Sequence, residues 1–173
     1  MPNPQARIEL IRASLAELNC DAYLLSTRDE FLGEFIPESK ERLKWLSGFS
    51  GSNGYLLVTK DSAAFLTDGR YLFQAKQELP SGIRVYDQAE RSLANFIKEV
   101  AGDGNVVLDS FSYAITQVNE LTKAGIAIVD LKHNQTDKHW HRDIKSSKFI
   151  EIFKLKYSGK SSKEKQEKVL TEL

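Results

Sequence analysis

The sequence predicts an α/β fold, a three-layer sandwich in which helices cover both faces of a mixed, mostly buried sheet. Strand-like and helix-like segments alternate from residue 4 to residue 129. Several strand-like segments are continuous apolar runs, which is typical of strands that are covered on both faces. Residues 55–58 and 63–66 are two such runs joined by a short turn at Lys60 and Asp61. At least one strand pair is therefore antiparallel, which makes the sheet mixed.

Caps, breakers and periodicity place the elements along the chain. The first helix begins at Pro4, because proline suits a first turn and Asn3 can accept hydrogen bonds from the free N–H groups. Its apolar residues recur on one face, at Ile8, Ile11, Leu15 and Leu18. Further helices are predicted at residues 37–46, 71–79, 92–100 and 115–124. Further strands are predicted at residues 22–25, 83–86, 106–108 and 126–129.

The chain length and composition are those of a globular protein. Its 173 residues can form one domain with a core, or one domain and a fragment of another. No apolar run approaches about 18 residues, and the amino terminus lacks the layout of a signal peptide, so we expect no membrane association. Cys20 is the single cysteine, which we expect to be buried and to form no disulfide framework. A cytoplasmic location is predicted.

The net charge of zero is unevenly distributed. Residues 1–131 contain 13 Lys and Arg against 18 Asp and Glu, and residues 132–173 contain 11 against 6. The two parts therefore carry about −5 and +5 charges. A basic segment can indicate nucleic-acid binding, but residues 162–168 alternate lysine with glutamate, as a solvated helix face does. We expect no nucleic-acid partner.

After Leu131 the sequence becomes more polar and loses its regular apolar periodicity. We predict that residues 1–131 form the α/β domain and that residues 132–160 are a linker, with Trp140 as a large anchor. Residues 161–173 are predicted to form a helix capped by a serine. A helix of little more than three turns is marginal without a surface to pack on, so we expect it to be the first element of a truncated second domain.

A loop with three glycines, Gly48, Gly51 and Gly54, invites comparison with phosphate-binding loops. Such a loop needs a strand before it and a helix after it, so that the helix amino terminus meets the phosphate. Here a predicted helix precedes the loop and a predicted strand follows it. The sequence therefore favours a sharp connection whose glycines allow positive φ or close packing, with no cofactor.

Other reactive residues do not form a known catalytic or metal-binding pattern. His133, His139 and His141 are close in sequence, but the spacing of the last two places them on different faces of a helix. Ser50 and Ser52 have the wrong spacing for a nucleophile elbow. We therefore predict no catalytic residue and no metal ligand in this chain.

The segment from Asp68 to Tyr71 combines a carboxylate, a glycine, an arginine and an aromatic ring. Asp68 falls at the carboxyl end of a predicted strand, where it can cap the helix that follows. Arg70 can pair with Asp68 or project toward a partner surface. A structural role and a contact role both remain open for this segment.

Several segments together resemble the amino-terminal domain of the aminopeptidase P branch of the creatinase/prolidase superfamily. Residues 42–52, RLKWLSGFSGS, resemble its R-x-x-W-L-S-G-F-x-G-S run, and residues 67–75, TDGRYLFQA, resemble its T-D-G-R-Y-x-x-Q-A segment. Residues 134–142 resemble its linker into a second domain, although Gln135 and Thr136 replace an apolar pair and His139 replaces isoleucine.

This resemblance implies a non-catalytic domain. Enzymes of this branch carry two α/β domains before a catalytic domain, which holds two divalent metals, usually manganese, and removes the residue that precedes proline at a peptide's amino terminus. The ligand motifs of that domain do not occur in this sequence, so the chain alone is expected to be inactive. The implied partners are the catalytic domain of the same polypeptide, other copies in a homo-oligomer, and proline-containing peptides.

The resemblance also implies that the domain supports oligomerisation and forms a wall of the substrate cleft. The residues expected to make such contacts are Trp45, Phe49, Asp68, Arg70 and Tyr71. A stand-alone binding or scaffold protein of the same fold, without peptidase activity, is the alternative. Whether the gene continues beyond Leu173 would discriminate between the two.

Overall fold

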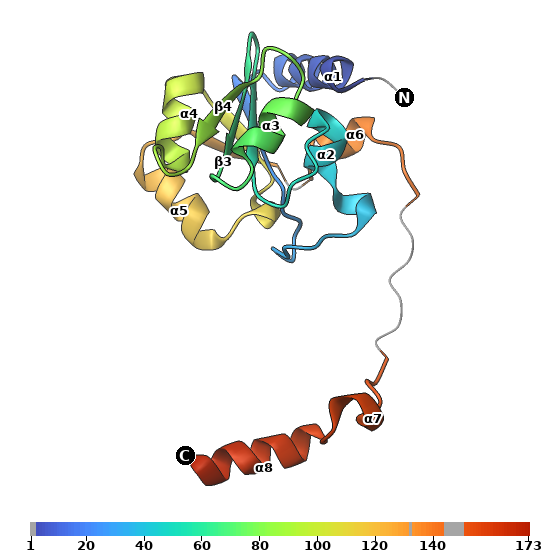
Figure 1. Ribbon diagram of the computed structural model, residues 1–173. Coiled ribbons are helices and arrows are strands. Elements are labelled where there is room, and N and C mark those ends of the chain that lie inside the picture. Colours follow the sequence, from blue (N-terminus) through green and yellow to red (C-terminus); the bar gives the residue numbers. More distant parts are fainter. Residues whose placement is uncertain (1–2, 132, 144–150) are drawn as a thin grey trace. The chain divides into compact units, whose positions relative to one another are not determined.

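A computed structural model describes residues 3–131, 133–143 and 151–173 (Figure 1). The chain divides into two compact units, of which the first ends at Asp143. Residues 133–143, which we expected to belong to a linker, pack with the α/β domain in this first unit. The second unit contains two helices, α7 (Leu155–Ser158) and α8 (Ser162–Glu172).

Six strands form one sheet in the order β4-β3-β2-β1-β5-β6. They are β1 (Ala22–Ser26), β2 (Tyr55–Thr59), β3 (Ala63–Thr67), β4 (Arg84–Asp87), β5 (Val106–Leu108) and β6 (Ile128–Asp130). β2 is antiparallel to both of its neighbours, and the other pairs are parallel. The predicted mixed sheet is confirmed. The carboxyl ends of five strands lie along one side of the sheet, which we call the carboxyl edge.

Helices cover both faces of the sheet, which confirms the predicted sandwich (Figure 1). One apolar cluster joins the sheet to α1 (Pro4–Glu17), α2 (Arg42–Ser47) and α3 (Leu72–Glu78). A second cluster joins the opposite face to α4 (Leu93–Ala101) and α5 (Ile115–Lys123). Neighbouring strand residues enter opposite clusters, Leu56 the first and Leu57 the second, because side chains alternate along a strand.

Two local predictions are wrong. The single helix expected at residues 37–46 is a 3₁₀ turn, η1 (Glu38–Lys40), followed by α2. Glu41 separates them because its ψ of 56° is not helical. Asp68 does not cap α3, because that helix begins one residue after Tyr71 and the Asp68 carboxylate bonds Arg70 instead. In addition, β4 begins one residue later than expected and β6 begins two residues later.

The glycine loop is structural in this domain, as the sequence predicts. Gly48 ends α2 with a φ of +86°, in the left-handed region that glycine adopts at helix ends. A Cβ added to Gly51 or Gly54 would lie less than 3.0 Å from aromatic carbons. One glycine therefore supplies backbone freedom, and the other two allow the loop to pass close to core side chains.

The second unit is polar and helical. The Ser161 hydroxyl caps α8 by accepting from the Glu164 N–H, and the Ser161 N–H donates to the Glu164 carboxylate, which confirms the predicted serine cap. The apolar residues Val169, Leu170 and Leu173 are exposed in this unit. None of the helices among residues 3–131, 133–143 and 151–173 is long and apolar enough to cross a membrane.

Candidate functional site

The carboxyl edge is where this fold places exposed functional groups. The connection after β1 runs to β2 on one side, and the connection after β5 runs to β6 on the other, so the strand order reverses between β1 and β5. Open α/β sheets bind ligands beside such a reversal. The Ser26 hydroxyl donates to the Ser112 carbonyl over 3.1 Å and ties together the two loops that meet there.

Asp68 and Arg70 form a two-point ion pair in the loop between β3 and α3. The Arg70 Nε and Nη2 atoms lie 3.0 and 2.9 Å from the two Asp68 carboxylate oxygens. This pairing holds the pKa of Asp68 well below its usual range. The Arg70 side chain nevertheless remains 68% exposed, so it is paired and projects outward at once. The loop presents a fixed cation at the carboxyl edge.

Tyr71 links this loop to the core. Its hydroxyl lies 2.8 Å from the Ser52 hydroxyl, and its ring meets the Phe49 ring edge-on with centroids 5.9 Å apart. Phe49 packs in turn on Phe65, with ring centroids 4.7 Å apart, and is only 1% exposed. Phe49 therefore supports the loop from beneath, and almost none of its surface is exposed.

Trp45 lies on another face of the domain. It is 9% exposed and stacks on Trp140, with ring centroids 5.7 Å apart and an interplanar angle of 17°. Of the five residues that the sequence groups together, the structure brings Asp68, Arg70 and Tyr71 to the carboxyl edge. It places Trp45 and Phe49 in the core.

Sequence reasoning missed a group of exposed apolar side chains at the carboxyl edge. Each follows the carboxyl end of β1, β3 or β5, and each is more than 60% exposed. The group, which we call the apolar edge, consists of Phe31, Phe35, Phe73, Phe111 and Ile115. Large apolar residues in an otherwise polar loop, such as residues 27–36, were the signal that could have found it.

A pocket of about 210 Å³ lies beside this group, between the loop that follows β1 and the glycine loop. Phe35, Ile36, Leu43 and Phe49 supply its apolar lining. Glu34 is among its polar lining residues. The pocket suits a single apolar side chain of a partner, because its volume is below the range typical of small-molecule sites.

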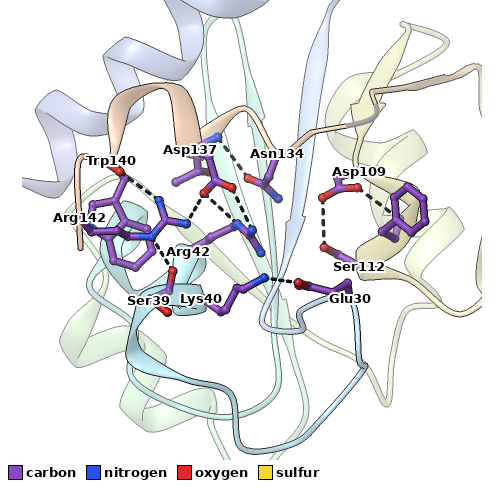
Figure 2. Close-up of polar contacts among 12 residues, drawn as sticks. Glu30, Ser39, Lys40, Arg42, Asp109, Ser112, Asn134, Asp137, Trp140 and Arg142 are labelled. Atoms are coloured by element: carbon purple, nitrogen blue, oxygen red, sulfur yellow. Dashed lines mark hydrogen bonds and ion pairs between the residues drawn. The ribbon is translucent and has the colours of Figure 1, made fainter. Parts of the chain in front are cut away.

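A second polar network lies where residues 133–143 meet the domain (Figure 2). Asp137 in α6 (Thr136–His139) lies between the guanidinium groups of Arg42 and Arg142. Burial acts to raise the pKa of Asp137, but the bonds from the two arginines outweigh it and lower the pKa. The carboxylate is therefore ionised, and both of its oxygens accept hydrogen bonds from arginine side chains.

Asp109, at the end of β5, is buried without a cationic partner within hydrogen-bond distance among the described residues. It accepts from the Phe111 N–H over 3.3 Å and from the Ser112 hydroxyl over 3.5 Å (Figure 2). Burial raises its pKa, so the folded protein binds a proton more readily than the unfolded chain does. The contribution of Asp109 to stability is therefore greatest at low pH. It is lost as the pH rises above about 3.9, which is the pKa of an aspartate side chain in the unfolded chain.

Asp109→Asn is expected to raise the free energy of unfolding at pH 7 by up to about 1 kcal/mol, because the amide keeps an acceptor and avoids a buried charge. Urea unfolding between pH 3.5 and 7 measures this change. Asp61→Asn, in the exposed turn between β2 and β3, is the matched control and should have no effect. A less stable Asp109→Asn variant at pH 7 would contradict the expectation.

The histidines do not gather around a common point in the described residues. His139 lies against α1, where its Nε2 is 2.8 Å from the Ser14 hydroxyl, and burial lowers its pKa. No group of three His, Cys, Asp or Glu side chains in residues 3–131, 133–143 and 151–173 is arranged to hold a metal ion.

Curated relatives align with most of the chain. Aminopeptidase P2 of Arabidopsis thaliana is 34% identical over 166 residues, which are 88% of this chain and 23% of the plant protein. Probable Xaa-Pro aminopeptidase P of Talaromyces stipitatus is 28% identical over 175 residues, which are 94% of this chain and 26% of that protein. The chain thus spans about a quarter of the length of these relatives.

Solved structures share the fold. X-prolyl aminopeptidase from Caenorhabditis elegans, described as a cytosolic enzyme with a di-nuclear active site, superposes with a TM-score of 0.81 at 25% identity, over 99% of this chain and 31% of that one. The N-terminal domain of the cytoplasmic peptidase PepQ from Mycobacterium tuberculosis gives 0.61 at 30% identity, over 77% and 97%. The family profile matches residues 7–134. The chain belongs to the Creatinase/Prolidase N-terminal domain family.

Proposed function

We propose that this chain is the non-catalytic N-terminal domain of an Xaa-Pro aminopeptidase, and that it contributes to oligomerisation and to the wall of the substrate cleft. The relatives named aminopeptidase P support the enzyme class, and the quarter of their length that the chain spans supports a non-catalytic part. The reaction is the removal of the amino-terminal residue before proline. Its chemistry then belongs to residues outside this chain.

The observation that carries the proposed contact role is the composition of the carboxyl edge. Arg70 stands 68% exposed over the ring of Tyr71, with its guanidinium carbon 5.2 Å from the ring centroid. The apolar edge adds Phe35 and Phe73, which are 91% and 73% exposed. A fixed cation at the same edge of the sheet as exposed aromatic rings suits contact with a second protein surface or with a peptide.

Metal chemistry enters this proposal only through the rest of the polypeptide. The Caenorhabditis elegans relative has a di-nuclear active site, and we propose two divalent metals, manganese in the first place, in the catalytic domain of the parent protein. A cytoplasmic location is proposed because that relative is described as cytosolic. The chain itself would position the catalytic domain and its peptide substrates.

The test inserts a large side chain at the centre of the proposed contact. Gly69 is exposed, its φ lies outside the left-handed region, and a Cβ there would have no atom within 4 Å. Gly69→Trp in the longer gene product should leave the fold intact, because Gly69 is exposed and the position of the new Cβ is open. Hydrolysis of Xaa-Pro-Xaa peptides with added manganese is expected to fall about tenfold or more. Sedimentation measures the oligomeric state in parallel.

Ser81→Trp is the matched control, because Ser81 is exposed at the opposite end of β4. It should leave both activity and association unchanged. If Gly69→Trp also leaves both unchanged, the carboxyl edge is not the contact surface. Peptide cleavage by residues 1–173 alone would contradict the non-catalytic assignment. Binding of a partner protein by a gene product that ends at Leu173 would favour the scaffold alternative instead.

A further inference from the structure

We propose that residues 133–143, which we call the strap, are a latch that opens without unfolding of the sheet domain. When closed, the latch fixes the point at which the polypeptide leaves the first compact unit. The strap is the last part of that unit, which ends at Asp143. This inference concerns a different surface from the carboxyl edge and does not rest on the proposed function.

An ionic clamp holds the middle of the strap. Asp137 receives Arg42 Nε at 2.9 Å, Arg42 Nη2 at 2.9 Å and Arg142 Nη2 at 2.7 Å (Figure 2). The Arg42 side chain, from α2, is 9% exposed, and that of Arg142, from the strap itself, is 11% exposed. One carboxylate therefore joins the strap to the domain through shielded, charge-assisted hydrogen bonds, which are stronger than neutral ones.

A stack of four side chains holds the end of the strap. The Arg7 guanidinium lies 4.8 Å from the Trp45 ring centroid, Trp45 stacks on Trp140 at 5.7 Å, and Arg142 lies 4.1 Å from the Trp140 centroid. Arg142 also donates to the Ser39 carbonyl in η1. Strap and domain residues thus overlie one another in a ladder of cations and indole rings.

Polar contacts also anchor the start of the strap. The buried Tyr23 hydroxyl donates to the Asn134 side-chain oxygen over 2.6 Å and lies 3.2 Å from the Thr136 hydroxyl. His139 contacts Ser14 on α1 over 2.8 Å. The strap is consequently held along its whole length, mainly by hydrogen bonds and charges, and Trp140 is its one large apolar side chain that packs against the core.

The composition of the strap is the reason that it can open alone. Trp140 is the one large apolar side chain among the eleven residues of the strap, and the strap adds no strand to the sheet. Segments with few buried apolar contacts open at lower free energy than the core does. Two buried polar atoms lack a protein hydrogen-bond partner in the described part of the chain, Gln135 Oε1 and Arg7 Nε, and both lie at the strap or beneath it.

Opening the latch would have two consequences for the molecule. It would uncover Trp45 on the α1–α2 face, because Trp140 is the ring that stacks on it. It would also release eleven residues of chain, so that the exit point would no longer be fixed at Asp143. The latch is therefore a conformational device that couples the exposure of Trp45 to the release of residues 133–143 from the first compact unit.

The test uses trypsin, because Lys138 and Arg142 place two cleavage sites inside the strap. Asp137→Asn keeps the size of the side chain but removes the charge that both arginines bind. Cleavage at these two sites is expected to accelerate roughly 10- to 100-fold, as expected for lost hydrogen bonds to charged groups. The chain has two tryptophans, so near-ultraviolet circular dichroism reports directly on the Trp45–Trp140 stack.

Asp143→Asn is the matched control, because Asp143 lies at the end of the same segment and is exposed. Trp140→Leu is a second variant, which removes the stack and leaves the ionic clamp in place. In both strap variants, cleavage within the sheet domain, at Lys98 for example, should stay at the wild-type rate. If strap and sheet cleavage rise together, or if Asp137→Asn behaves like Asp143→Asn, the latch is overturned.

Discussion

Replacing Gly54 with alanine is expected to lower the free energy of unfolding by about 2–3 kcal/mol, because it overpacks the centre of the domain. The added Cβ would lie 2.2 Å from Cζ of Phe65 and 3.0 Å from each of its Cε atoms. Phe65 cannot withdraw, because it is fully buried in β3 and its ring packs on Phe49. The strain therefore falls on the β2–β3 pair, next to the loop that carries Asp68.

Gly69→Ala is the control for this prediction, because its Cβ enters open space. The change there should stay within about 0.5 kcal/mol, as for most exposed substitutions. Urea unfolding measures both variants, and an unchanged slope with a lower midpoint for Gly54→Ala would assign the effect to stability alone. Equal midpoints for the two variants would mean that the Phe65 ring can move aside, contrary to the expectation.

The fold could be predicted from the sequence because its strands are apolar runs that only a covered sheet can bury. Residues 22–25 and 106–108 are such runs, and they lie side by side as β1 and β5. The glycine loop could also be interpreted, because its place between a helix and a strand excludes a phosphate site. The separate tasks of Gly48 and Gly54 could not be predicted, since they depend on φ and on the position of Phe65.

The candidate site could be predicted only in part. The motif of Asp68, Arg70 and Tyr71 led to an exposed edge, but the same reasoning grouped it with Trp45 and Phe49, which are buried. An aromatic residue in a loop or short helix can face either way, and sequence periodicity is too short there to decide. Ion pairs between residues far apart in the sequence could not be predicted either. Arg42 and Asp137 are 95 residues apart, and each alone resembles an ordinary surface residue.

Replacing Arg42 with alanine is expected to lower the free energy of unfolding by about 2–3 kcal/mol. Removal of one partner from a buried ion pair costs 3–5 kcal/mol, because a charge is left desolvated. The cost here should fall below that range, since the Asp137 side chain is 32% exposed and keeps Arg142 as a partner. Lys44→Ala is the control on the same helix, because its pair with Glu41 is exposed and should contribute little.

The latch sets a limit on this loss, and a double variant can reveal it. Once Arg42 is gone, Asp137 can regain water by opening the strap, so the cost cannot exceed the free energy that holds the strap closed. Asp137→Asn should then add little to Arg42→Ala, because both changes open the same segment. Urea unfolding of the single and double variants measures this. If the loss of unfolding free energy in the double variant equals the sum of the losses in the two single variants, the strap stays closed in both single variants. The two charges would then stabilise the domain independently.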